Sequence, residues 1–201
     1  MREHRGVVNA SDRRRTAALA GHTGAVEEAR ALLQDPDPGV RGTALAALAR
    51  LGQAGPAEVG AALRDPSPEV RRRACRVAVG VRAVELAHLL DDDDAGVVEV
   101  AAWAVGERGD ASGEVVDRLS AVATGHDDAL CREAAVAALG AVGDERGLPA
   151  ILSAIRDKPA IRRRAVIALA PFEGPEVDAA LERALTDRDW QVRQAAEDLS
   201  S

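Results

Sequence analysis

A short pattern recurs along the chain about every 30 residues. It reads "DPDPGVRGTA" at residues 35–44, "DPSPEVRRRA" at 65–74 and "DRDWQVRQAA" at 187–196. Each copy can be aligned on an apolar residue, and the separations between these anchors are 30, 27, 34, 30 and 31 residues. The anchors are Val40, Val70, Val97, Cys131, Ile161 and Val192, and all but Val97 are followed by arginine. Regular repetition of this kind indicates that each copy is one structural unit of a repeat protein.

Each copy predicts two helices joined by a short corner. In the first copy, the stretch 25–34 places apolar residues on one helical face. Asp37 then suits the N-cap of a second helix, Pro38 suits its first position, and Gly52 suits its end. One helical pair cannot bury its own apolar face, whereas stacked pairs can. The sequence therefore predicts an all-α protein, a right-handed α-α superhelix of about six helical pairs.

The domain boundaries follow from the same pattern. Residues 11–201 are expected to form a single repeat domain, preceded by an N-terminal extension over residues 1–10. The stretch "SDRRRTAALAG" at 11–21 resembles the second helix of an incomplete copy. We expect it to act as an N-terminal capping helix that covers the apolar end of the stack.

The composition favours helices and argues against some classes of function. Phe172, Trp103 and Trp190 are the whole aromatic set, so the core must consist of small and aliphatic side chains. Such a core suits close helix–helix contacts and does not suit a β-sandwich. The net charge of -7 disfavours a free-standing nucleic-acid binder, which usually carries a basic excess.

The cysteines and the apolar runs indicate the cellular compartment in which the protein is expected. Cys75 and Cys131 are too few for a disulfide framework, and both fall in apolar helical stretches. The N-terminal stretch lacks the apolar core of a secretory signal, and no apolar run approaches the roughly 18 residues of a membrane span. We therefore expect a cytoplasmic protein without a membrane partner.

The pattern resembles HEAT-like repeats of the short type found in phycobilisome-lyase-like proteins. The residues that carry the resemblance are Asp35, Pro38, Val40, Arg41, Ala44, Ala47, Leu48 and their equivalents. The resemblance implies that the corner aspartates and the helix arginines pair in a ladder between copies. The expected members of this structural ladder are Asp35, Arg41, Asp65, Arg71, Arg132, Arg162, Asp187 and Arg193. Arg132 is expected to pair with Asp127 or a residue next to it.

No pattern in the sequence points to catalysis, a metal or a cofactor. The four histidines lie in different copies, without metal-ligand spacing. The His-Glu pairs of the iron hydroxylases built from HEAT-like repeats are missing. The acidic run at 91–94 aligns with the corner "QDPD" at 34–37, so we interpret it as a corner and an N-cap. Cys75 and Cys131 occupy packing positions, so neither is expected to act as a nucleophile. With no catalytic, metal or cofactor pattern, we predict a protein that is not an enzyme and has no cofactor.

The second helices of this type of solenoid line its concave face, where residues four apart share one stripe. The predicted partner-binding groove comprises Arg72, Arg76, Glu99, Trp103, Glu107, Glu133, Arg163 and Ile167. Trp103 is the candidate anchor, because exposed Trp and Arg often dominate binding. The alternative is that Trp103 packs onto Arg76 and stiffens the stack. Trp190 takes the corner position of Pro38 and Pro68 and is expected to cover the corner.

Three functions remain open. We favour a non-enzymatic scaffold or adaptor that binds an unidentified protein or peptide in the concave groove. A HEAT-like alkylpurine DNA glycosylase or DNA-binding protein is the second possibility, because Trp103 and Glu107 are flanked by arginines. The net charge, together with Glu99 and Glu133 in the same groove, argues against it. The third is a phycobilisome-lyase-like factor, although repeat similarity alone transfers no activity.

Overall fold

The computed structural model describes residues 9–200, which form two compact units, one up to Glu85 and one from Leu86. Every regular element within these residues is a helix. The all-α prediction is thus confirmed for the described part of the chain. Most of the predicted N-terminal extension, residues 1–8, lies outside the described residues.

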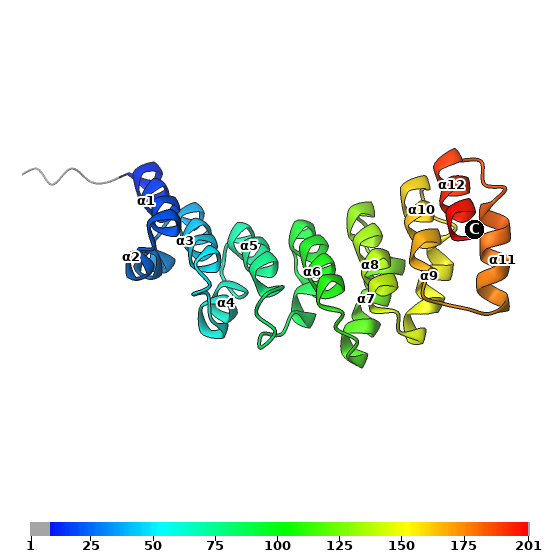
Figure 1. Ribbon diagram of the computed structural model, residues 1–201, viewed down its shortest axis with the longest axis horizontal. Coiled ribbons are helices and arrows are strands. Elements are labelled where there is room, and N and C mark those ends of the chain that lie inside the picture. Colours follow the sequence, from blue (N-terminus) through cyan, green and yellow to red (C-terminus); the bar gives the residue numbers. More distant parts are fainter. Residues whose placement is uncertain (1–8, 201) are drawn as a thin grey trace, which may run out of the picture. The chain divides into compact units, whose positions relative to one another are not determined.

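The first unit contains two layers of helices. Its helices are α1 (Ala10–Thr23), α2 (Val26–Ala31), α3 (Pro38–Arg50), α4 (Pro56–Ala62) and α5 (Pro68–Ala78), with a 3-10 turn η1 (Leu32–Gln34) after α2. Within this unit α1, α3 and α5 lie side by side, while α2 packs on α3 and α4 packs on α5 (Figure 1). The predicted capping segment is the helix α1, which packs against both α2 and α3.

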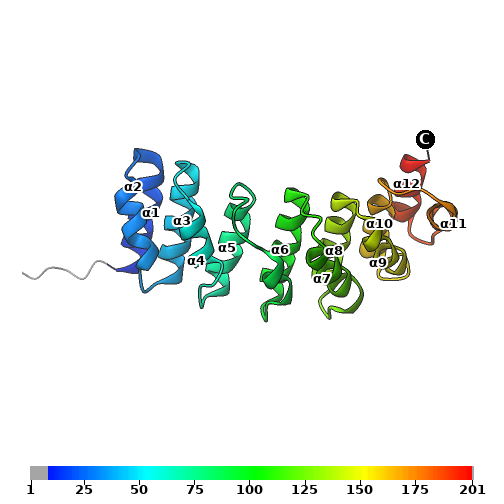
Figure 2. The ribbon, with the colours of Figure 1, turned by 90° about the horizontal axis from the view of Figure 1, so that it is seen from below.

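The second unit repeats this arrangement over a longer stretch. It comprises η2 (Ala87–Asp91), α6 (Ala95–Arg108), α7 (Gly113–Gly125), α8 (Ala129–Val142), η3 (Glu145–Gly147), α9 (Leu148–Ala154), α10 (Pro159–Ala168), α11 (Pro175–Ala184) and α12 (Trp190–Leu199). The second helices α6, α8, α10 and α12 form one layer of neighbours. The first helices α7, α9 and α11 form the other layer; in Figure 2, α7 overlaps α8 and α9 overlaps α10.

The corners begin their helices as the sequence predicts. The side chain of Asp37 accepts a hydrogen bond from the backbone N–H of Val40, and that of Asp94 accepts one from Val97. Each bond satisfies one of the N–H groups that a helix start leaves without a partner. Pro38 supplies the first residue of α3, where its missing N–H costs little. Local chemistry therefore sets where α3 and α6 start.

The repeated apolar anchors form the core. Each of the six has at most 1% of its surface exposed: Val40, Val70, Val97, Cys131, Ile161 and Val192. Small residues then let neighbouring second helices approach closely. A Cβ atom added to Gly140 on α8 would lie 2.6 Å from the Cα of Ala168 at the end of α10. Such closeness requires glycine, because real Cβ atoms do not approach a backbone atom to that distance.

The third copy departs from the prediction. Its first element is the 3-10 turn η2, not an α-helix. The anchors Val70 and Val97 of this copy are separated by 27 residues, the shortest spacing in the chain. In this copy the helical pair therefore consists of the 3-10 turn η2 and the helix α6.

The close approach at Gly140 gives a stability test. Gly140→Ala should lower the free energy of unfolding by about 1–3 kcal/mol, because the added methyl group must push α10 away from α8. Gly42→Ala on α3 is the matched control, since no atom lies within 4 Å of its added Cβ. We expect the control to be neutral or to stabilise by up to about 1 kcal/mol through helix propensity. Urea unfolding followed by circular dichroism measures both; equal stability of the two variants would contradict the packing described here.

Candidate functional site: the arginine–aspartate ladder and the face of the second helices

A corner arginine can join two successive copies, as Arg41 does. Arg41 donates from Nε and Nη2 to the two carboxylate oxygens of Asp65, at 2.8 and 2.6 Å. Its Nη1 donates to the carbonyl oxygens of Asp35 and Pro36, at 2.9 and 3.2 Å. The same guanidinium therefore holds the corner before its own helix and the corner of the following copy. Bidentate, charge-assisted bonds of this geometry are among the stronger hydrogen bonds in proteins.

The same two-oxygen contact occurs elsewhere in the chain. Three further pairs have donor–acceptor distances from 2.6 to 3.0 Å: Arg13–Asp35, Arg132–Asp157 and Arg162–Asp187. Each pair spans one copy. The expectation that Arg132 pairs with Asp127 or an adjacent carboxylate is therefore wrong. Asp127 contributes only its backbone carbonyl, 3.0 Å from Nη1 of Arg132.

Two arginines of the predicted ladder donate hydrogen bonds to carbonyl oxygens of the corner before their own helix. Arg71 donates from Nη1 to the carbonyls of Asp65 and Pro66, at 2.9 and 3.2 Å. Arg193 donates from Nη1 to the carbonyl of Asp187, at 2.7 Å. Two residues in the observed pairs were absent from the predicted set. Asp157 was recognisable as a corner aspartate, whereas Arg13 is one of three consecutive arginines, and only the tertiary contact distinguishes it.

The bridges shift the acidity of the aspartates. Hydrogen bonding from Arg132 lowers the pKa of Asp157 below its ordinary value, and Arg162 does the same to the pKa of Asp187. The carboxylate of Asp157 also accepts a bond from the backbone N–H of Lys158, at 2.7 Å. These aspartates are therefore held ionised as acceptors in the corner, which is a structural role.

A different set of side chains occupies the face of α6 in the second unit. Glu99, Trp103 and Glu107 lie four residues apart, so they form one stripe. Trp103 has 44% of its surface exposed. Glu107 is exposed and Glu99 is half-buried. An exposed indole thus lies between two carboxylates, one helical turn to either side.

The face continues over the neighbouring helices α8 and α10. Glu133 on α8 corresponds to Glu99, and its Oε1 lies 3.5 Å from Nη2 of Arg164 on α10. Ile167 on α10 corresponds to Trp103 and has 39% of its surface exposed, and Arg163 is also exposed. We call α6, α8 and α10 together the second-helix face of the second unit. The predicted groove members Arg72 and Arg76 lie on α5, in the first unit, so this face does not include them.

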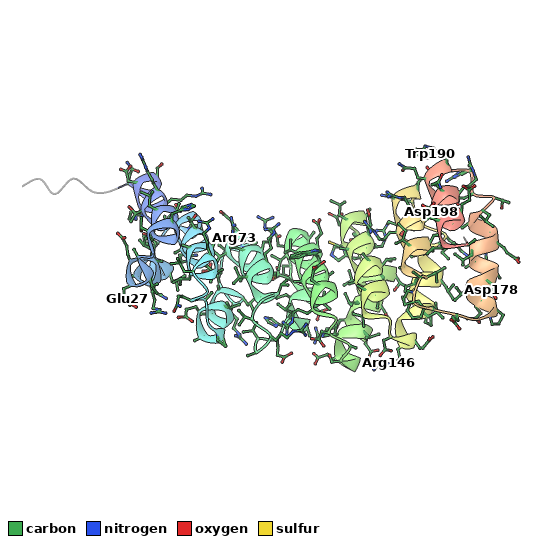
Figure 3. The ribbon with its side chains drawn as sticks, viewed as in Figure 1. Glu27, Arg73, Arg146, Asp178, Trp190 and Asp198 are labelled. Atoms are coloured by element: carbon green, nitrogen blue, oxygen red, sulfur yellow. The ribbon has the colours of Figure 1, made fainter. Side chains whose placement is uncertain are left out.

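The second tryptophan lies in a different setting. Trp190 is the first residue of α12, at the corner position that the alignment assigns to it. Figure 3 shows it at one end of α12, with Asp198 further along the same helix. Its surface is 64% exposed, so most of the indole faces solvent. That the remainder covers the corner stays a prediction.

The two thiols are packing residues in the described chain. Cys75 and Cys131 are both buried, and neither forms a disulfide within the described residues. The sulfur of Cys131 donates to the carbonyl of Ala95 at 3.1 Å, which ties α8 to α6. Burial, with the charges of Asp128 and Glu99, raises the pKa of Cys131 to about 11. This thiol is protonated at neutral pH and is therefore a poor nucleophile.

Residues 9–200 contain no group of three or more His, Cys, Asp or Glu side chains placed to hold a metal ion. Within the same residues, no helix has the length and apolar character needed to span a bilayer.

A repeated pair of helices with a buried anchor and a corner bridge defines a class of α-repeat proteins, and comparison with known families names it. The family model of HEAT repeats matches residues 56–139, 83–160 and 116–200, which together cover more than half of the chain. The chain belongs to the HEAT-repeat family. No curated protein matches the chain.

Solved structures confirm the HEAT-like solenoid class of fold. A designed armadillo repeat protein in complex with the peptide (KR)4 has a TM-score of 0.62 at 18% identity, covering 87% of this chain and 98% of that one. An engineered protein has a TM-score of 0.66 at 20% identity, covering 87% and 96%. Human deoxyhypusine hydroxylase has a TM-score of 0.50 at 20% identity, covering 97% and 80%. These neighbours include an enzyme and a designed peptide binder, so the fold alone does not decide the function.

The ladder gives a second stability test. Arg132→Ala should lower the free energy of unfolding by about 2 kcal/mol, because it leaves Asp157 and two corner carbonyls without their donor. This loss is smaller than the roughly 3–5 kcal/mol that follows when one partner of a fully buried ion pair is removed. The reason is that the side chains of Arg132 and Asp157 are 14% and 22% exposed. Urea unfolding provides the measurement. Arg163→Ala, an exposed arginine on the next helix, is the control and should leave the midpoint unchanged.

The same bridge predicts a pH dependence. The pKa of Asp157 is lower in the folded protein than in the unfolded chain. The stability difference between wild type and Arg132→Ala should therefore be complete above pH about 4, the ordinary pKa of aspartate. It should shrink as the pH falls through the lowered pKa of Asp157. A difference that stays constant down to pH about 2 would contradict the bridge.

Proposed function

We propose that the chain is a non-enzymatic scaffold or adaptor, and that its second-helix face holds a segment of a protein or peptide partner with Trp103 as the anchor. The exposure of Trp103 carries this proposal. The chain has only three aromatic residues, and one of them lies 44% exposed beside small residues on a helical face. Covering the exposed part would remove about 100 Å² of surface from water, which corresponds to about 2.5 kcal/mol.

The charges of this face favour a polypeptide over a nucleic acid. Glu99, Glu107 and Glu133 all lie on it, and the chain has a net charge of -7. Binding to phosphates would need several arginines that are not compensated by acidic groups. Arg164 contacts Glu133, which leaves Arg163 as the exposed arginine of the face. The glycosylase alternative therefore gains no support from the second unit.

The absence of enzymatic activity is also part of the proposal. The thiol of Cys131 has a raised pKa and is buried, so it is not poised to attack a substrate. The designed armadillo protein in complex with the peptide (KR)4 supports a peptide-binding role for a solenoid of this class. Two free cysteines fit the cytoplasmic location that we propose.

A selection from a displayed peptide library would test the proposal. We expect the full chain to enrich peptides that bind the wild type and bind Trp103→Ala roughly seventy-fold more weakly, as the loss of about 2.5 kcal/mol implies. Trp190→Ala is the matched control, because it removes the other, more exposed indole from a corner. It should leave binding unchanged, and both variants should have the same melting temperature as the wild type.

Two results would overturn the proposal. One is a selection that yields no peptide whose binding depends on Trp103. The other is a Trp103→Ala variant that melts several degrees lower while peptide binding persists, which would make the indole a packing residue. Binding of single-stranded or duplex DNA that weakens steeply with salt would instead favour the nucleic-acid alternative.

A further inference from the structure

The carboxylates beside Trp103 differ from Glu133 on α8 and from Asp157 in the corner before α10. Glu133 has Arg164 as its neighbour at 3.5 Å, and Asp198 accepts a hydrogen bond from Gln194 at 2.9 Å. Asp157, in the corner before α10, is bridged by Arg132. Within residues 9–200, no ion pair joins Glu99 or Glu107 to a basic side chain. Two uncompensated carboxylates therefore flank one exposed indole on the same stripe of α6.

We infer that Glu99, Trp103 and Glu107 form a subsite for the cationic side chain of a lysine or arginine in the bound segment. The inference rests on the proposed function and specifies the chemistry of its partner. The face of an indole ring attracts a cation more strongly than that of any other side chain. A carboxylate one turn before and one turn after the ring can pair with the same cation or with its neighbour in the segment.

The surroundings of the subsite support a cation over other ligands. The negative charge of Glu99 reaches the neighbouring helix, since it contributes with burial and Asp128 to the raised pKa of Cys131 on α8. The charged groups that α8 presents on this side are Arg132 and Glu133, and both have partners, in Asp157 and Arg164. An anionic segment would therefore meet only repulsion at α6, whereas a cationic one would relieve the repulsion between Glu99 and Glu107.

The neighbouring helices of the second-helix face indicate which other side chains the bound segment should carry. Ala137 on α8 and Ile167 on α10 occupy the positions equivalent to Trp103. Helices in contact lie about 8–10 Å apart, so the apolar surface of Ile167 lies about 16–20 Å from α6. An extended segment covers that distance in about five or six residues. The segment that fits has its lysine or arginine at α6 and an apolar side chain about five residues away.

The composition of the chain allows a direct assay. Trp103 and Trp190 are the only tryptophans, and the chain has no tyrosine. In the background of Trp190→Phe, the tryptophan emission therefore reports on Trp103 alone. The probe is a synthetic eight-residue peptide of alternating lysine and arginine, titrated at about 0.15 M salt, where charges further apart than about 8 Å are largely screened.

We expect a saturable change in the emission of Trp103. Replacing both acids by Glu99→Gln and Glu107→Gln should weaken the binding about five-fold to twenty-fold, in line with the loss of two exposed ion pairs. The matched control changes the net charge equally by Glu176→Gln and Asp178→Asn on α11. These acids lie in the other layer of the second unit, where Figure 3 shows Asp178. The control should weaken binding by less than about two-fold.

The outcomes separate this inference from the function on which it rests. No change in emission up to about 1 mM peptide, or equal weakening by the two pairs of variants, would overturn the cationic subsite. If the peptide library yields ligands that depend on Trp103 but carry no lysine or arginine, the binding function stands and the subsite is refuted. If it yields none that depend on Trp103, the function itself fails.

Discussion

The bridge from each arginine to the next corner aspartate is the interaction on which the repeat depends. A corner leaves carbonyl groups exposed after the first helix, and these would otherwise need water or a side chain as donor. Arg41 satisfies two of them with Nη1 and uses Nε and Nη2 for Asp65. Only a planar guanidinium has donors in this arrangement, so lysine could not replace it. Where it forms within a unit, as between Arg41 and Asp65 or Arg162 and Asp187, the bond fixes the position of one second helix against the next.

Close packing between the second helices follows from that fixed spacing. Gly140 lies against Ala168, and Gly106 on α6 lies against Ala138 on α8. Contacts this short leave room only for small side chains between the helices. The outer stripe of the same helices is consequently made mainly of small or charged residues. A large indole such as Trp103 cannot enter the packed interior from this position, which explains why it stays exposed.

The sequence predicted those features that depend on local chemistry. The anchors such as Val40 are buried and corner residues such as Asp37 cap their helices, because period and cap geometry are written within a few residues. It could not predict the partner of Arg132, since that bond joins residues of different copies. It also could not select Arg13 among three adjacent arginines, or show that the third copy begins with a 3-10 turn.

Departures from the repeat gather in the third copy, and this bears on function. That copy has the shortest spacing, a 3-10 turn in place of a helix, and buried Val98 where the others have the ladder arginine. It also carries Trp103. Stacking requires that the packing positions keep the same kinds of residue in every copy. A position can therefore acquire a binding role only where its side chain is not needed for stacking. Helix α6 meets this condition, because close packing at Gly106 and the bond from Cys131 to Ala95 hold it against α8 without the arginine.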